Sequence, residues 1–278
     1  MLISFACEKC GRRYKVEESK IGAKANCTDC GAELEVPDPQ TYVESGESES
    51  EAAETRSEPS ETVLGGQEAI ELISNHIEKH IGAIDGVIHE SGSDLVPVDL
   101  HVVPPTDERP FYTVITSGMS DRPMRVPAEL SGLRFAELLI CLPPDWPLTQ
   151  ADFQDEANYW PLGLVKRLAR LTHENDTWLG FGQTVPNSDP PQPYAENTQF
   201  SCALIGIPLL SDKEFWKLEV SESKTIHFYS VVPMYPEETD YKLSKGLDQL
   251  LQRFDKHQVS ELLELDRRNV GKSRWKFF

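Results

Sequence analysis

A stretch of 25 residues, from Asp38 to Thr62, divides this chain into two parts that have to fold separately. The stretch holds eight acidic side chains and one basic one, Arg56, among serine, threonine, proline and glycine, with almost nothing apolar after Val43. A segment of this composition repels itself and buries too little apolar surface to offset the conformational entropy lost on ordering. The sequence therefore predicts three regions: a small N-terminal domain (1–37), an acidic disordered linker (38–62) and a main domain (63–278).

Four cysteines in the N-terminal domain have the spacing of a zinc site. Cys7 and Cys10 form one CxxC pair, Cys27 and Cys30 form a second, and 16 residues separate the pairs. Two such turns present four thiolates to one tetrahedral ion, and the glycine that follows each pair suits the positive φ of a tight turn. A segment of this size cannot hold a core unaided, so zinc binding would supply most of its folding free energy. We predict one structural Zn²⁺ per chain, with no open position for catalysis.

The same segment, from Ile3 to Pro37, resembles the small zinc ribbons at the N-termini of many bacterial proteins. A redox-active dithiol is the alternative for the CxxC pairs. Residues 1–37 carry six acidic and six basic side chains, so their charge is not biased towards nucleic acid. The ribbon is interpreted as a protein-docking module, and docking to nucleic acid or to a transcription complex is the alternative.

Hydrophobic periodicity divides the main domain into helices and strands without regular alternation. Apolar residues at three- and four-residue steps predict helices at 68–81, 158–173 and 237–256. Alternating or continuous apolar runs predict strands at 96–103, 111–116, 135–142, 200–207 and 225–232. The order helix, strands, helix, strands, helix favours an α+β fold, in which helices pack on a mixed or mostly antiparallel sheet.

The main domain lacks the common signatures of catalysis. The sequence has no P-loop, GxGxxG, GxSxG or HExxH motif. Cys141 with His89, His101 or His173 could make a nucleophile and base. His101 could also make an acid–base or metal cluster with the carboxylates of Asp94, Asp99, Asp107 and Glu108. However, Cys141 lies inside an apolar strand, where cysteine is ordinarily a buried hydrophobe, and alternation places Asp99 and His101 on a solvated face. We predict no enzymatic activity, and an enzyme that uses a pocket near His101, Asp99 or Cys141 is the alternative.

Three predicted loops combine turn-forming residues with large apolar ones. They run from 116 to 124, from 142 to 148 and from 177 to 187. If the loops meet on one side of the domain, their methionine and aromatic side chains form anchors within a polar rim, as in protein-binding surfaces. The alternative is that the tryptophans cover the edge of the core. The candidate protein-binding residues are Met119, Asp121, Met124, Asp145, Trp146, Trp178 and Phe181.

Four collinear motifs resemble the bacterial branch of the Suppressor of fused domain family. They are YTVITSGMSDRPMRVP (112–127), RFAELLICLPPDWPL (134–148), NYWPLGLVKRLARLTHENDTWLGFGQTVPN (158–187) and FYSVVPMYPEETDYKLSKGLDQLL (228–251). The resemblance covers about residues 68–268. It implies a sandwich-like domain of helices and strands that binds protein and has no enzymatic activity.

The resemblance also bears on the kind of partner. Animal members carry a second domain and sequester Gli-type transcription factors by holding a short peptide between the two domains. We do not expect these 278 residues to hold such a second domain, so that groove is not carried over. Bacterial relatives include immunity proteins that neutralise toxins by direct binding. Residues 63–278 carry 32 acidic and 20 basic side chains, a charge that suits a basic toxin or regulator and disfavours nucleic acid. Solubility is the other explanation for this acidity.

Two further features concern location and the end of the chain. No apolar run approaches the ~20 residues of a transmembrane helix, and the first residues lack a signal peptide. Together with the CxxC pairs, these features predict a cytoplasmic protein without membrane contact.

Residues 266–278 hold five basic and three aromatic side chains. We expect this tail to fold back onto its own acidic domain, and docking elsewhere is the alternative.

Overall fold

The computed structural model describes residues 2–6, 13–17, 20, 22–28, 31–35, 67–89 and 97–272. By its internal contacts the chain divides into two compact units, Met1–Ser60 and Glu61–Phe278. In the first unit, two antiparallel pairs of strands are described: β1 (Leu2–Ala6) with β2 (Arg13–Glu17), and β3 (Lys24–Asn26) with β4 (Glu33–Glu35).

One turn of the predicted zinc site lies within the described residues. The Cys27 amide donates to the Ala32 carbonyl oxygen at 2.7 Å, and the Gly31 amide donates to the Cys27 carbonyl oxygen at 2.9 Å. Gly31 has a φ of 70°, the positive value expected for the glycine that follows a CxxC pair, and Cys27 is buried. The four-sulfur site itself stays a prediction, because its other members lie outside the described residues: Cys7, Cys10 and Cys30.

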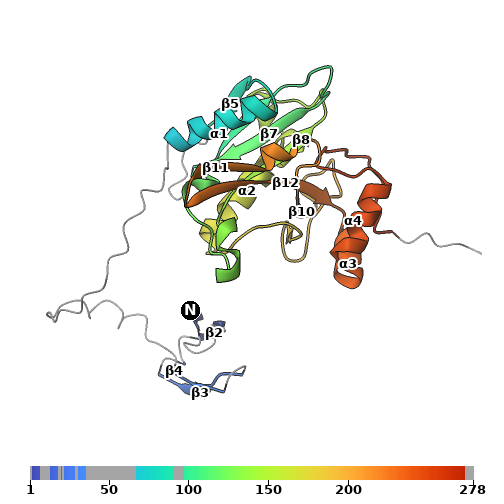
Figure 1. Cartoon of the computed structure of the whole chain (residues 1–278). Helices are drawn as coiled ribbons and strands as arrows, with labels where there is room; N and C mark the ends of the chain where they lie inside the picture. Colours follow the sequence, from blue (N-terminus) through green and yellow to red (C-terminus); the bar gives the residue numbers. More distant parts are fainter. Residues whose placement is uncertain are drawn as a thin grey trace, which may run out of the picture. The chain divides into compact units, whose positions relative to one another are not determined.

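The described strands of the second unit form one mixed sheet of eight strands (Figure 1). In order across the sheet they are β5 (Gly86–Ile88), β6 (Asp99–Val103), β7 (Tyr112–Ser117), β8 (Phe135–Leu142), β12 (Lys224–Met234), β10 (Cys202–Gly206) and β9 (Thr184–Pro186). The remaining strand, β11 (Lys217–Ser221), pairs with the first half of β12. Neighbouring strands are antiparallel except β8 and β12, which are parallel. The α+β fold with a mixed sheet is confirmed.

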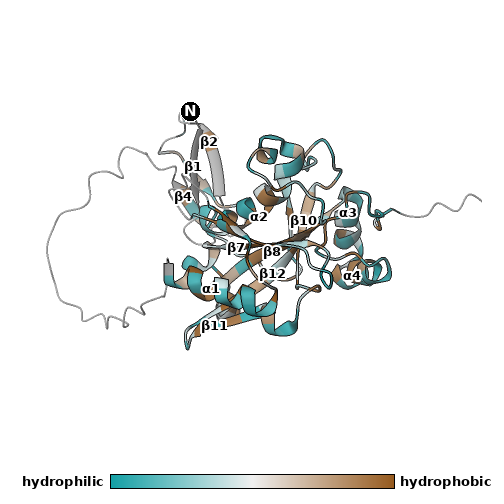
Figure 2. Ribbon diagram, turned by 90° about the horizontal axis from the view of Figure 1, so that it is seen from above, coloured by the Kyte–Doolittle hydropathy of each residue, from teal (hydrophilic) through white to brown (hydrophobic). Residues whose placement is uncertain are grey.

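Helices cover both faces of the sheet (Figures 1 and 2). Helix α1 (Gln67–His80) packs on one face, together with odd-numbered β8 residues such as Leu139. Helix α2 (Glu156–Glu174) packs on the other face, with even-numbered β8 residues such as Leu138. Helices α3 (Pro236–Lys245) and α4 (Leu247–Lys256) cover the α1 face further along, over β10 and the end of β12. Short 3₁₀ helices lie at Met119–Asp121, Ala128–Leu133, Asp152–Gln154 and Lys213–Trp216. Within the described residues, no helix is both long and apolar enough to cross a membrane.

This two-sided cover corrects the prediction of a solvated face on β6. His101 is 1% exposed, and its cross-strand partner Ile115 belongs to the cluster under α1. Alternation along one strand predicts which residues share a face, but it does not reveal whether a second layer covers that face. The predicted polar face is therefore wrong for His101, whereas Asp99 is only partly buried and pairs with His89.

Helix α2 begins earlier than predicted and contains a proline in its second turn. Asp155 caps it by accepting a hydrogen bond from the Ala157 amide at 2.9 Å. Pro161 has no amide hydrogen to give to the Ala157 carbonyl, so that carbonyl would lose its helical partner. The side-chain amide of Asn197 donates to it instead, at 2.9 Å. A loop 40 residues away in sequence thus makes the proline tolerable inside the helix.

The last predicted helix, 237–256, is in fact two helices. Gly246 separates α3 from α4 and has a φ of 91°, a left-handed conformation that ends one helix and that other residues rarely adopt. The apolar stripe continues across the break, and for this reason periodicity alone predicted a single helix. The break lets α3 and α4 pack against each other at the end of the sheet.

Candidate protein-binding site

The loop after β7 (116–124) folds inward onto one buried carboxylate, that of Glu137 in β8. Glu137 Oε1 accepts hydrogen bonds from the backbone amides of Gly118 at 3.1 Å and Ser120 at 2.9 Å, and from the Ser120 hydroxyl at 2.7 Å. Its Oε2 accepts a hydrogen bond from the Thr116 hydroxyl at 2.6 Å. Burial raises the pKa of Glu137 to about 7, although these hydrogen bonds favour the charged form. The carboxylate therefore holds the loop inside the domain.

Three of the seven proposed surface anchors are instead part of the core, which corrects their assignment. Met119, Met124 and Trp146 are 0%, 4% and 9% exposed and belong to the cluster under α2. The Trp146 indole donates to the Asn158 carbonyl oxygen of α2 at 3.0 Å, so its loop is fixed against that helix. For these three residues the structure favours the alternative, in which the large side chains complete the core.

The other four candidate residues lie at or near the surface. Phe181 and Asp145 are exposed, and Asp121 and Trp178 are half-buried. Two of the three loops do meet, because the Leu179 amide donates to the Met124 sulfur at 3.4 Å. The candidate residues therefore do not form one surface, because three are buried in the core. Of the four at or near the surface, Phe181 is the exposed large apolar residue.

The residues of the enzymatic alternative do not converge. His101 Nε2 lies 2.9 Å from the Ser117 hydroxyl, and burial lowers the pKa of His101. Cys141 lies two strands away, where burial raises the pKa of its thiol well above the usual range. Asp99 pairs with His89 at 2.9 Å. A thiol with a raised pKa and no histidine beside it is a poor nucleophile.

An apolar pocket opens on the α1 face of the sheet, between the end of β10, the second half of β12 and helix α4. Its volume is about 510 Å³. Gly206 and Ser230, which face each other across β10 and β12, are small residues in its lining, and a Cβ on Gly206 would lie 2.7 Å from the Ser230 hydroxyl oxygen. Because both residues are small, they leave space on the α1 face of the sheet beside α4.

Three exposed apolar side chains surround this pocket. Phe181, Leu209 and Leu210 are 48%, 60% and 36% exposed, and all three line it. The wall on the α4 side includes Leu251, Phe254 and Asp255. Only Phe181 was among the residues predicted from the sequence. The apolar run from 203 to 210 was a possible signal for the two leucines, but the strand predicted at 200–207 ends before them.

One buried carboxylate also lines the pocket. Glu261 is 1% exposed, and its Oε1 accepts a hydrogen bond from the Leu210 amide at 2.8 Å. Its Oε2 finds no hydrogen-bond partner among the described residues. Burial raises the pKa of Glu261, against the hydrogen bonds it accepts from the backbone. The pocket thus combines apolar walls with an acidic group under the loop that carries Leu209 and Leu210.

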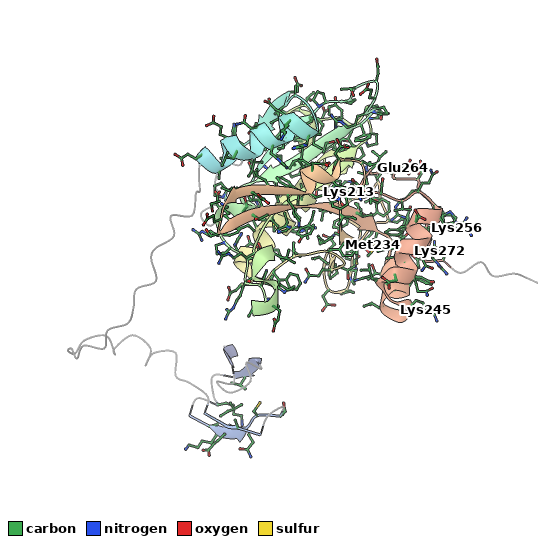
Figure 3. The ribbon with its side chains drawn as sticks, in the orientation of Figure 1. Lys213, Met234, Lys245, Lys256, Glu264 and Lys272 are labelled. Carbon is green, nitrogen blue, oxygen red and sulfur yellow. The ribbon has the colours of Figure 1, made fainter. Side chains whose placement is uncertain are left out.

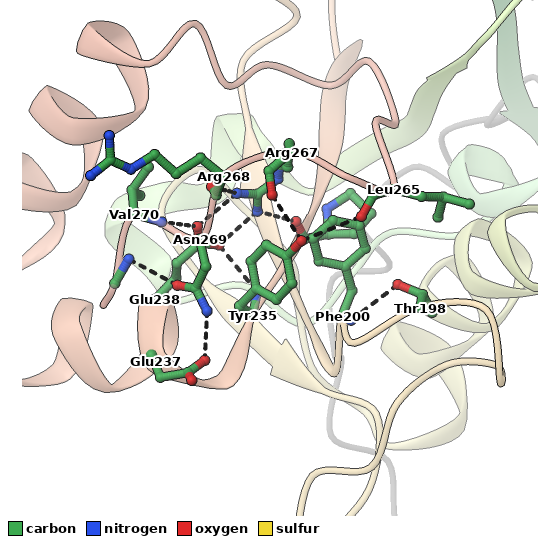
Figure 4. Close-up of polar contacts among 12 residues, drawn as sticks. Thr198, Phe200, Tyr235, Glu237, Glu238, Leu265, Arg267, Arg268, Asn269 and Val270 are labelled. Carbon is green, nitrogen blue, oxygen red and sulfur yellow. Dashed lines mark hydrogen bonds and ion pairs between the residues drawn. The ribbon is translucent and has the colours of Figure 1, made fainter. Parts of the chain in front are cut away.

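A buried ion pair holds the last described segment against the sheet (Figure 4). Arg267 donates to both carboxylate oxygens of Glu238 at 2.6 Å, and the two side chains are 6% and 0% exposed. Glu238 also accepts from the Val270 amide at 3.0 Å, and the Tyr235 hydroxyl donates to the Arg267 carbonyl oxygen at 2.9 Å. This pair, which we call the C-terminal clamp (Glu238 and Arg267), fixes the chain that follows the pocket residues 258–261.

Comparisons with known proteins show which family this chain resembles. The model of the Suppressor of fused protein (SUFU) family matches residues 94–268, a range that includes the clamp and every residue lining the pocket. A comparison of the sequence with curated proteins finds no significant match.

Two solved structures have a similar fold. A SUFU (suppressor of fused protein) homologue from Neisseria gonorrhoeae FA 1090 has 18% identity and a TM-score of 0.51, over 74% of this chain and 98% of that one. The Sufu–Fu complex has 13% identity and a TM-score of 0.52, over 73% of this chain and 92% of that one. These likenesses agree with the family match, which spans more than half of the sequence. The chain therefore belongs to the Suppressor of fused protein family.

Proposed function

We propose that this chain is a non-enzymatic protein-binding module, which sequesters or neutralises a partner protein by taking an apolar side chain of that partner into the pocket beside α4. The observation that carries the proposal is the gathering of Phe181, Leu209 and Leu210 around one apolar pocket. Apolar pockets ringed by exposed large side chains are typical of protein-docking sites. A relative of similar fold has been solved in complex with the protein Fu, which supports binding as the mode of action.

The charge of the chain bears on the partner. The sequence carries a formal net charge of −19, and the exposed carboxylate of Asp255 lines the pocket itself. Complementary charge accelerates association and excludes partners of like charge. The partner that fits best is a basic protein, either a toxin or a regulator, that presents a large apolar side chain.

Replacing Leu209 and Leu210 together with aspartate is expected to abolish partner capture, because two carboxylates would enter the apolar rim of the pocket. The full-length wild-type and variant proteins would be used to capture partners from their native cells, with quantification of co-purified proteins by mass spectrometry. Leu243→Asp is the matched control, because Leu243 lies on α3 and is 76% exposed. A partner lost equally from both variants, or retained by both, would place the binding surface elsewhere.

The N-terminal unit is proposed to be a structural zinc ribbon that positions the binding module, with Cys7, Cys10, Cys27 and Cys30 as ligands. The described turn supports this, because Cys27 is buried and the positive φ of Gly31 allows the tight turn that the second CxxC pair needs. The ion would tie the two CxxC turns together.

The purified chain is expected to hold about one zinc ion per molecule. Replacing Cys27 and Cys30 with serine should remove the metal, while the thermal unfolding transition of the main unit stays unchanged. Elemental analysis and calorimetry measure the two quantities, and Cys202→Ala, which lies in β10, is the control that keeps the metal. Loss of the main transition in the double variant would show that the two units do not fold independently.

A further inference from the structure

We propose that the last six residues of the chain, 273–278, occupy the pocket beside α4 and compete there with the partner. The inference rests on the proposed function only in using the same pocket. The six residues, Ser-Arg-Trp-Lys-Phe-Phe, contain three aromatic and two basic side chains. The pocket offers apolar walls, and the carboxylates of Asp255 and Glu261 line it. The aromatic side chains of the segment therefore suit the apolar walls of the pocket, and its basic side chains suit the carboxylate at the edge.

The segment starts from a fixed point close to the pocket. Val270 is buried in an apolar cluster with Leu204, Val232 and Phe254, which also line the pocket. The Val270 carbonyl oxygen accepts a hydrogen bond from Arg253 of α4. Two residues later, Lys272 Nζ lies 3.5 Å from Glu237 Oε1. Figure 3 shows Lys272 at the same end of the unit as Lys245 and Lys256, which end α3 and α4.

The length of the segment is sufficient to reach the pocket. Arg253 lies on the flank of α4 opposite to Leu251 and Asp255, because residues two apart on a helix are separated by about 200°. The segment therefore has to cross one helix, which is roughly 10–12 Å wide with its side chains. Six extended residues span up to about 20 Å, so Phe277 and Phe278 can enter the pocket while Arg274 and Lys276 stay near the exposed Asp255 at its edge.

Tethering makes even a weak contact effective. A short linker gives the segment an effective concentration on the order of 1 mM at the pocket. If the free segment binds with a dissociation constant of about 0.1 mM, the tethered segment occupies the pocket about ten to one. A partner has to displace it, so the segment would make the pocket selective for partners that bind more tightly than the segment does.

The test measures binding of a fluorescently labelled peptide of residues 272–278 to full-length proteins. The recipient is a tail variant, Trp275→Ala with Phe277→Ala and Phe278→Ala, which cannot fill its own pocket. We expect the peptide to bind this variant about tenfold more tightly than the wild-type chain.

Control variants test whether the peptide binds in the pocket. Adding Leu209→Asp to the tail variant should abolish binding, and adding Leu243→Asp should not. A peptide with Arg274→Glu and Lys276→Glu should fail to bind. Equal affinity for wild type and tail variant, or binding that survives Leu209→Asp, would overturn the proposal.

A second measurement locates the segment in the intact protein. With p-benzoylphenylalanine in place of Phe278, illumination should cross-link the end of the chain to Phe181 or to residues 204–210 within one molecule. Cross-links to other surfaces, or between two copies of the chain, would contradict occupation of the pocket in cis.

Partner capture separates this inference from the proposed function. If the segment competes with the partner, the tail variant should capture more partner than the wild-type chain. Equal capture, still abolished by the Leu209 and Leu210 change, would reject this inference and leave the proposed function standing.

Discussion

Replacing Arg267 with alanine is expected to lower the free energy of unfolding of the main unit by about 3–5 kcal/mol. The change leaves the carboxylate of Glu238, which is 0% exposed, buried without its bidentate partner. It also removes the guanidinium that packs over the rings of Phe200, Tyr235 and Phe254. In a unit of about 200 residues this corresponds to a fall in melting temperature of about 10 °C. Urea unfolding followed by tryptophan fluorescence measures the loss.

Two further variants test whether the buried pair is the cause. Arg268→Ala removes the neighbouring, exposed arginine and should change stability by less than about 0.5 kcal/mol. Arg267→Lys keeps the charge but loses the planar guanidinium that contacts both carboxylate oxygens of Glu238. Its stability should therefore lie between that of the wild-type chain and that of Arg267→Ala. A loss below about 1 kcal/mol for Arg267→Ala would show that the clamp does not hold the C-terminal segment. Because this segment follows residues 258–261 of the pocket, the alanine variant should also weaken partner capture.

Replacing Glu137 with leucine is expected to lower the free energy of unfolding by about 3–4 kcal/mol at pH 7. Leucine cannot accept hydrogen bonds, so the backbone amides of Gly118 and Ser120 would be left buried without an acceptor. The loop has little room to move, because Gly118 packs so closely against the Pro97 carbonyl that a Cβ would not fit there. Thermal unfolding measures the loss, and Glu129→Leu, at an exposed position, is the control. A loss as small as that of the control would show that the loop finds other acceptors.

The pH dependence of the same residue provides an independent check. The pKa of Glu137 is raised from 4.5 in the unfolded chain to about 7 in the fold. Between these values the folded chain holds a proton that the unfolded chain has released, so the contribution of Glu137 to stability decreases as the pH rises from 4.5 to 7. Glu137→Gln removes this titration. The difference in stability between wild type and this variant should therefore change across that window, and a constant difference would contradict the raised pKa.

Several features of the fold could be predicted because they are encoded by neighbouring residues. The strand at 135–142 was predicted with its exact bounds, since eight consecutive residues suit the interior of a sheet. The helix that begins near 68 follows from isoleucines at three- and four-residue steps. The positive φ of Gly31 follows from the requirements of a CxxC turn.

The candidate site was less predictable, since its residues come together from distant parts of the chain. Phe181 was identified, but Leu209 and Leu210 lie just beyond the strand predicted at 200–207 and were not singled out, and nothing local marked Glu261. Met119, Met124 and Trp146 looked like surface anchors because they lie in loops. The loops turn inward where these side chains join the apolar core, and Glu137 and the carbonyl of Asn158 offer buried hydrogen-bond partners there.

The sequence by itself determined the class of the fold and the family, because periodicity and collinear motifs are properties of the chain read in order. Tertiary structure alone decided which strand faces are covered, where α3 ends and α4 begins, and where the sheet is hollowed. It also brought Arg267 to Glu238 across 29 residues of sequence. These outcomes depend on which layers pack against each element, and the free energy of that packing is set by contacts between residues far apart in the sequence.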